Sequence, residues 1–456
     1  MSSKLRVFLE YILLFIIVLI FNFYSIGITH VDEIWMFGFP FNISSGLIAY
    51  RDFNMVIGPV YPTIIGLFMY CFGNNMFVFY VVHSLMIVFI YYLMKKICHN
   101  DLCIIVVVLL CIFLFPSYNL LLLLLLLLIL YMEKRNFSDY IIGFFLSVIC
   151  FTKINVGLFM LIPSFLSYYN DIYKLLRRLF SFLLFAFIML LIFFYNNSLI
   201  QFINYTIIGL FDFATNNFYI SFFIVLWFVC LFFLIIEIIK KRNNSFLEFY
   251  LLFFLIIAYP IFDFYHVFIA VVPTGVYLFS KLKIKSIHLK IFAFAILILF
   301  LFFNLININS LNLKKIPNSV FFKYKYVNDD FIDNYNYVKS ILNNTYDYDK
   351  VFLFSSFAYA YKIENNISID RFDLINNGNM GFDGENRYIS FIDDYCENKK
   401  CVFLVSRQEY ETNLYSQLNK KIIGYVINNY NLRDSVSNSS DWFEVYDNTK
   451  MCMFEK

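Results

Sequence analysis

The sequence predicts an all-α polytopic membrane domain over residues 1–307, followed by a small extracytoplasmic α/β domain over residues 308–456. Its 456 residues are 61% hydrophobic and 22% aromatic, which is more apolar than an ordinary soluble protein. Apolar runs alternate with clusters of lysine and arginine through the first part of the chain. After residue 307, asparagine, aspartate and lysine become frequent, so the composition itself indicates a domain boundary.

The clusters of lysine and arginine give the orientation, because cationic loops mark the cytoplasmic side of a membrane protein. All but two of the lysines and arginines in residues 1–307 fall in such clusters. Matching the apolar runs to the clusters predicts about eleven transmembrane helices with a cytoplasmic N-terminus. The predicted spans are 11–28, 77–94, 102–115, 120–132, 140–151, 156–169, 179–195, 218–239, 246–259, 264–279 and 291–306. We expect the first span to be retained rather than removed as a signal peptide, because no small-residue cleavage site follows it.

The segment 30–75 differs from the predicted spans. It is polar at its start and rich in glycine and proline, whereas its second half is apolar and aromatic. We therefore expect an outer loop that carries short helices lying in the membrane interface. A loop of this length is usually functional.

The C-terminal region has the pattern of a small mixed domain. Runs typical of strands occur at 351–354, 401–406, 422–427 and 442–446, and 331–342 is typical of a helix. The odd number of spans places the region outside the cytoplasm, and a cytoplasmic tail after an even number of spans is the alternative. Cys396 and Cys401 are candidates for a disulfide if the region is extracytoplasmic.

The two cations outside the clusters fall on the predicted outer side, together with several acidic residues and a histidine. They are Asp32, Glu33, Arg51, Asp52, Lys153, Asp263 and His266. Ionised groups near the depth of a membrane are costly unless they are solvated, paired or used in function. Their convergence on one face therefore indicates a candidate site.

Simpler explanations exist for each of these residues. Asp32 and Glu33 are also explained as the polar cap of a span. Lys153 is also explained as a side chain that reaches the outer headgroups, and Arg51 as the partner of Asp52 in an exposed ion pair.

Asp263 and His266 are three residues apart, about one helical turn, near the end of a predicted span. Together with Asp32 they are candidate ligands of a divalent metal ion, whereas a lone histidine at a span end is more often a satisfied polar residue. The net charge of +3 gives no indication of a nucleic-acid partner. No phosphate-binding glycine loop and no zinc-type cysteine pattern is present in the sequence.

These residue types suit the transfer of a sugar from a lipid-linked phosphate. A carboxylate accepts the proton of the acceptor hydroxyl as general base. The phosphate leaves as a stable anion and needs cations or hydrogen-bond donors to hold its charge. Direct displacement assisted by one base inverts the sugar carbon.

Three segments carry a resemblance to a known family. They are VDE (Val31–Glu33), GLIAYRDFNMVIGPVYPTIIGLFMYCFG (Gly46–Gly73) and FTKINVG (Phe151–Gly157). The order resembles the GT-C class of membrane glycosyltransferases, the group of bacterial protein O-mannosyltransferases and lipid A aminoarabinose transferases. Ile154 and Asn155 stand where that family usually has Gly-Pro. The resemblance covers roughly the first 170 residues, and DKVFLFSSFAYAY (Asp349–Tyr361) resembles the extracytoplasmic domain of bacterial members.

The resemblance implies roles for the candidate residues. Asp32 is expected to be the catalytic base, Glu33 to bind or position the acceptor, and Lys153 to contact the donor phosphate. We expect Arg51 at the same phosphate. We expect substrate contacts from Asp52, Asp263 and His266.

The sequence thus predicts a polytopic inner-membrane glycosyltransferase that uses a polyprenyl-phosphate-linked sugar donor. Its acceptor is expected to be a cell-envelope glycan, a lipid or a protein outside the cytoplasm. A flippase or transporter of lipid-linked saccharides is the first alternative, although the predicted spans are nearly free of charge. A polysaccharide polymerase is the second, although the outer loop near residues 196–217 is short for that class.

Overall fold

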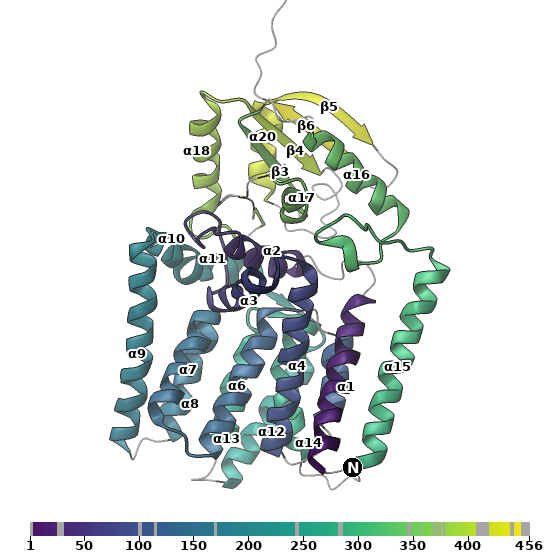
Figure 1. Ribbon diagram of the computed structural model, residues 1–456. Helices are drawn as coiled ribbons and strands as arrows, with labels where there is room; N and C mark the ends of the chain where they lie inside the picture. The colour runs from purple at the N-terminus through teal and green to yellow at the C-terminus, as the bar shows by residue number, and fades with distance from the viewer. Residues whose placement is uncertain are drawn as a thin grey trace, which may run out of the picture. The chain divides into compact units, whose positions relative to one another are not determined.

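The computed structural model describes most of the chain (Figure 1). The residues that it leaves undescribed are 1–2, 25–31, 99–102, 114–115, 168–170, 242–245, 281–285, 344–347, 356, 368, 370, 372, 374, 377–378, 407–418, 438–441 and 448–456. Val31 and the cations at 242, 281, 283 and 285, which entered the sequence analysis, lie outside the described residues.

The chain divides into two compact units, each assembled from three segments. The helical unit comprises Met1–Ser25, Ile57–Asn196 and Asn217–Asn307. The sheet unit comprises Ile26–Val56, Asn197–Asn216 and Ile308–Lys456. The C-terminal region therefore shares its unit with the start of the predicted outer loop and with the segment after residue 196, an association that the sequence did not predict.

Long apolar helices build the helical unit. They are α1 (Ser3–Phe23), α3 (Val60–Phe72), α4 (Met76–Cys98), α5 (Cys103–Phe113), α6 (Tyr118–Lys134), α7 (Asp139–Thr152), α8 (Ile154–Ser167), α9 (Ile172–Tyr195), α12 (Ile224–Lys241), α13 (Phe246–Phe254), α14 (Phe264–Ser280) and α15 (Ser286–Ser310). A 3-10 turn, η3 (Leu255–Ala258), extends α13, and β1 (Tyr219–Ile220) pairs in parallel with β2 (Ile261–Phe262). Each apolar run that was predicted as a span overlaps a helix, although the run 218–239 begins with β1.

Among the described residues, α4 and α9 have the length and composition of a membrane crossing, and other apolar helical stretches, such as Val60–Phe72 and Asp139–Thr152, are shorter. Neighbouring helices approach closely where glycine faces a backbone. A Cβ atom on Gly143 of α7 would lie 2.2 Å from the carbonyl oxygen of Arg178 in α9. Small residues at such contacts are the usual means by which helices pack in a membrane, because the apolar surroundings give little hydrophobic drive for association.

A buried ionic network joins one end of these helices. Arg178 of α9, 4% exposed, donates to both carboxylate oxygens of Glu133 at 2.6 and 3.0 Å and to Asp139 at 2.9 Å. It also donates to Ser164 of α8 at 3.0 Å, and Tyr250 of α13 donates to Glu133 at 3.0 Å. By sequence alone, Arg178 is one member of a predicted cytoplasmic cluster of cations. In the fold it is an internal connector of five helices.

The sheet unit combines short helices with a four-stranded sheet. Its helices are α2 (Asp32–Ser44), α10 (Leu199–Ile203), the π-helix η1 (Asn204–Ile208), α11 (Gly209–Asn216), the 3-10 helix η4 (Phe322–Tyr324), α16 (Asp329–Asn343), α17 (Ala358–Glu364), α18 (Gly384–Cys396) and α20 (Lys420–Asn429). The strands are β3 (Lys350–Phe354), β4 (Cys401–Ser406), β5 (Asn431–Ser437) and β6 (Trp442–Asp447), in the order β3-β4-β6-β5. Strands β3 and β4 are parallel, and the other pairs are antiparallel.

The structure confirms the predicted strands at 351–354, 401–406 and 442–446 and the predicted helix at 331–342. The predicted strand at 422–427 is wrong, because this run lies in α20. Asn419 caps that helix by accepting hydrogen bonds from the backbone of the first turn, and Ile422, Ile423 and Val426 form one buried helical face. The considered disulfide between Cys396 and Cys401 is confirmed, and it joins the end of α18 to the start of β4.

Replacing Gly143 by alanine tests the close approach of α7 and α9. The new methyl group would meet the Arg178 backbone, so we expect the variant to lose about 1–3 kcal/mol of stability, seen as a lower melting temperature in detergent. Gly275→Ala in α14 is the matched control, because no atom lies within 4 Å of its added Cβ. That variant should keep or slightly raise the melting temperature, since alanine favours a helix over glycine. Equal melting temperatures for the two variants would contradict the close packing.

Candidate functional site

The predicted site residues fall into one group in each unit. Asp32, Glu33, Arg51 and Asp52 belong to the sheet unit. Lys153, Asp263 and His266 belong to the helical unit. Each group has its own local geometry.

The acidic pair opens α2. Asp32 is the first residue of this helix and Glu33 the second, so both lie where the positive end of the helix dipole stabilises negative charge. Asp32 is half-buried, whereas Glu33 is only 1% exposed. The Glu33 Oε1 atom lies 2.6 Å from Nζ of Lys325, which is itself buried. Among the described residues, none donates a hydrogen bond to the other oxygen, Oε2.

Arg51 and Asp52 form the side-chain pair that the sequence analysis considered as the simpler explanation. The Arg51 guanidinium donates to both carboxylate oxygens of Asp52, at 2.8 and 2.9 Å. Asp52 also accepts a hydrogen bond from the backbone of Ile48 at 2.7 Å, which closes the turn. The hydrogen bond from Arg51 lowers the pKa of the Asp52 carboxyl. Asp52 is therefore tied into the turn, and Arg51 holds an exposed, bidentate contact.

Lys153 lies in the tight turn between α7 and α8. Its Nζ donates to the carbonyl oxygen of Ile257 at 3.1 Å and stands 5.7 Å above the ring of Tyr118. Desolvation by the surrounding protein lowers the pKa of Lys153 to about 8, and the negative charge of Asp263 opposes that shift. A lysine with this pKa changes its charge near pH 8 rather than above about pH 10.

The turn itself is held by close backbone contacts. The amide of Gly58 donates to the carbonyl oxygen of Thr152 at 3.1 Å, and a Cβ atom on Gly58 would lie 1.9 Å from the carbonyl oxygen of Phe151. The amide of Gly157 donates to the carbonyl oxygen of Lys153 at 3.0 Å. The turn thus forms although Ile154 and Asn155 replace the Gly-Pro of the resembling family.

Asp263 and His266 contact each other at the start of α14. The Asp263 Oδ1 atom accepts a hydrogen bond from the His266 amide at 2.8 Å and lies 2.8 Å from His266 Nδ1. Asp263 thereby caps the helix and also acts electrostatically on Lys153. Among the described residues, no group of three or more histidine, cysteine, aspartate or glutamate side chains is placed to hold a metal ion.

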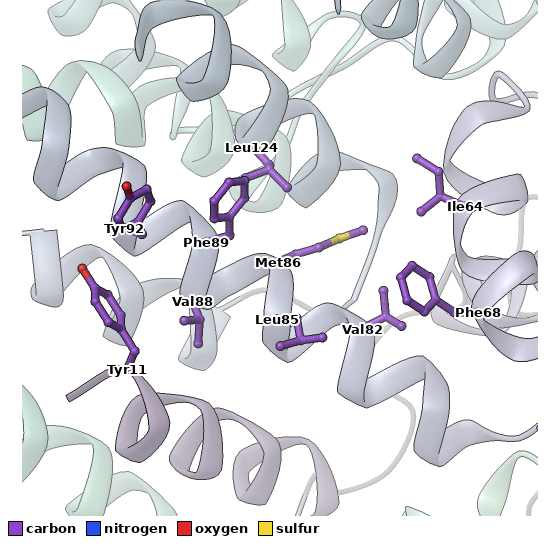
Figure 2. A pocket seen from close by; sticks show the side chains of 10 residues that line it. All are labelled: Tyr11, Ile64, Phe68, Val82, Leu85, Met86, Val88, Phe89, Tyr92 and Leu124. Carbon is purple, nitrogen blue, oxygen red and sulfur yellow. The ribbon is translucent and has the colours of Figure 1, made fainter. Parts of the chain in front are cut away.

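The helical unit also contains an open apolar groove of about 630 Å³ (Figure 2). Its lining comes from α1, α3, α4 and α6, and the side chains shown there are aliphatic or aromatic or belong to methionine. Tyr11 and Tyr92 supply the hydroxyl groups among the lining residues. The groove therefore suits an apolar chain rather than a sugar.

Sequence and structure comparisons give different amounts of information. No protein-family model matches the sequence, and no curated protein matches it. Among solved structures, the chain is similar to ArnT from Cupriavidus metallidurans bound to undecaprenyl phosphate, with a TM-score of 0.54 and 10% sequence identity. The match covers 99% of both chains. The likeness shows that this chain shares the overall fold of that protein, a polytopic and mostly helical one.

The environment of Lys153 predicts unusual amine reactivity. In competitive labelling with acetic anhydride read by mass spectrometry, we expect Lys153 to react half-maximally near pH 8, against about 10.4 for an ordinary lysine. Asp263→Asn should lower this midpoint further, because the removed carboxylate favours the charged amine. A midpoint at the value of an ordinary lysine would contradict the desolvated turn.

Proposed function

We propose that this protein is a membrane glycosyltransferase that moves a sugar from a polyprenyl phosphate carrier to an acceptor hydroxyl outside the cytoplasm. The observation that carries the proposal is the likeness over 99% of both chains to a protein solved with undecaprenyl phosphate bound. The local chemistry of each unit supports it, because the sheet unit has carboxylates at the start of α2 and the helical unit has a desolvated lysine between α7 and α8. In this proposal the protein resides in the bacterial plasma membrane with its N-terminus in the cytoplasm.

The acidic pair of α2, Asp32 and Glu33, acts on the acceptor, and we call this pair the acidic group. The Asp32 carboxylate takes the proton of the acceptor hydroxyl. At the same time, the oxygen of that hydroxyl forms a bond to the anomeric carbon of the sugar. The bond from that carbon to the phosphate oxygen breaks, and its electrons leave with the lipid phosphate. Attack from the opposite side inverts the anomeric carbon. Glu33 assists by binding the acceptor beside the base.

Lys153 and Arg51 bind the leaving phosphate. Lys153 stabilises the charge that develops on the phosphate oxygen, and its partly desolvated amine strengthens that interaction. Arg51 offers a second cation, with Asp52 fixing its fork. Asp263 and His266 contact the substrate and adjust the charge of Lys153. The apolar groove on α3 and α4 accommodates isoprenoid units of the carrier.

The residues leave the identity of the acceptor open among a cell-envelope glycan, a lipid and a protein. Transport or flipping of the lipid-linked saccharide remains the rival function. It requires binding of the donor without cleavage of the bond between sugar and phosphate. Release of sugar from the carrier therefore discriminates between the two.

Asp32→Asn tests the base. Membranes that contain the variant should release no labelled sugar from a panel of polyprenyl-phosphate sugars, because an amide cannot accept the proton. Asp329→Asn is the matched control, since Asp329 also opens a helix of the sheet unit but pairs with Lys314 at the surface. That control should transfer at the wild-type rate. Wild-type turnover by Asp32→Asn would remove the base assignment, and donor binding without sugar release by the wild type would favour a transporter.

Lys153 gives the proposed phosphate contact a pH dependence. Binding of undecaprenyl phosphate in nanodiscs should weaken about tenfold per pH unit above pH 8, because the free amine loses its proton there. Lys153→Arg should remove this loss up to about pH 10, since the guanidinium stays charged. Lys153→Ala should weaken binding at pH 7 by about tenfold to a hundredfold. Unchanged binding by the alanine variant would exclude Lys153 from the phosphate site.

A further inference from the structure

We propose that Lys325 is a positioning residue of the acidic group, which holds Glu33 so that its second carboxylate oxygen accepts a hydrogen bond from a substrate hydroxyl. This inference rests on the proposed function and adds a residue from the C-terminal region to the site. Lys325 Nζ lies 2.6 Å from Glu33 Oε1, and both side chains are almost fully buried.

The first support is that α2 is fixed to the rest of the sheet unit along its length. Beyond the Glu33 contact, the Phe37 ring packs edge-on against Phe321 at 5.5 Å, and the Phe39 ring against Tyr359 at 5.7 Å. Gly38 leaves room for that tyrosine, because a Cβ atom there would lie 2.6 Å from its ring. The helix that begins with the acidic pair thus cannot turn independently of the C-terminal region.

The second support is that Lys325 is itself presented rigidly. Glu364, at the end of α17, accepts hydrogen bonds from the Ser319 hydroxyl and from the amides of Val320 and Phe321, at 2.5, 3.0 and 2.7 Å. Residues 319–321, which Glu364 holds, lead directly into η4. The amide of Lys325 closes η4 by donating to the carbonyl oxygen of Phe322 at 3.1 Å. A preorganised support of this kind lowers the cost of fixing a long lysine side chain.

The third support is the incomplete bonding of Glu33. Glu364 uses both carboxylate oxygens, since Oε2 accepts from Val320 and from Tyr335 while Oε1 accepts from Ser319 and Phe321. Glu33 uses only Oε1, and its buried Oε2 accepts no hydrogen bond from the described residues. A buried acceptor without a donor is costly, so a hydrogen-bond partner for this oxygen is expected.

These features point to a hydroxyl donor as the missing partner. Lys325 occupies one oxygen of Glu33, and the other oxygen is left to accept a hydrogen bond. The neighbouring residue is Asp32, the proposed base. A hydroxyl bound at Glu33 would lie next to the group that deprotonates the acceptor.

The test separates positioning from simple stability. It compares Lys325→Met, Lys325→Arg, Glu33→Gln and the double variant Glu33→Gln/Lys325→Met, with Lys314→Met as control because Lys314 forms an exposed pair with Asp329. Each protein is assayed for melting temperature in detergent. Each is also assayed for release of labelled sugar from a panel of undecaprenyl-phosphate sugars in membranes that contain the endogenous acceptor.

We expect Lys325→Met to lower the melting temperature and to reduce kcat by about tenfold to a hundredfold while the KM for the donor changes little. Lys325→Arg should recover most of the turnover. The double variant should regain melting temperature, because neither buried charge is left alone, yet remain as slow as Glu33→Gln. Lys314→Met should match the wild type.

Two outcomes overturn the inference. Recovery of both stability and turnover in the double variant would show that the pair is only structural. Wild-type melting and turnover in Lys325→Met would show that Lys325 does not position Glu33. If the wild type releases no sugar from any donor, the proposed function fails and the substrate hydroxyl with it, whereas non-additive melting shifts would still establish the pairing.

Discussion

A charge taken out of water needs an opposite charge or enough hydrogen bonds, and this requirement shapes both units. In the helical unit it draws five helices onto the guanidinium of Arg178, where Glu133 uses both of its oxygens. In the sheet unit it joins the first turn of α2 to Lys325. The first arrangement is complete and therefore structural. The second leaves one carboxylate oxygen without a donor among the described residues, and this is the oxygen that we assign to a substrate hydroxyl.

The sequence predicted the helices of the helical unit well because their signal is local. Each apolar run is bounded by polar or cationic residues, and every one of them overlaps a helix. The sheet unit was predicted less completely. A run of branched apolar residues at 422–427 suits a strand or a buried helix equally, and the capping by Asn419 decides for the helix. The division into units was not predictable, since it joins segments far apart in the chain.

The candidate site was predictable in its residues but not in its partners. Asp32 and Lys153 are conspicuous because they lie at the predicted outer ends of spans, away from the cationic clusters. Lys325 lies in a polar region where lysine is common, so nothing in the local sequence distinguishes it from Lys323 or Lys314. Its role appears only when the fold places it against Glu33. The same holds for Arg178, whose cationic neighbours made it look like an ordinary cytoplasmic anchor.

The cation of the helical unit suits a leaving group that must also be released. Arg51 carries a permanent charge, but its Nε and Nη2 groups already donate to Asp52. Lys153 is different, because desolvation lowers its pKa to about 8 and a bound anion restores the preference for the charged amine. In the proposed reaction, Lys153 therefore stabilises the phosphate most strongly while the phosphate carries its full negative charge. Once the lipid phosphate departs, the negative charge of Asp263 still acts on the amine, and the backbone contacts of Gly58 and Gly157 hold the turn that carries it.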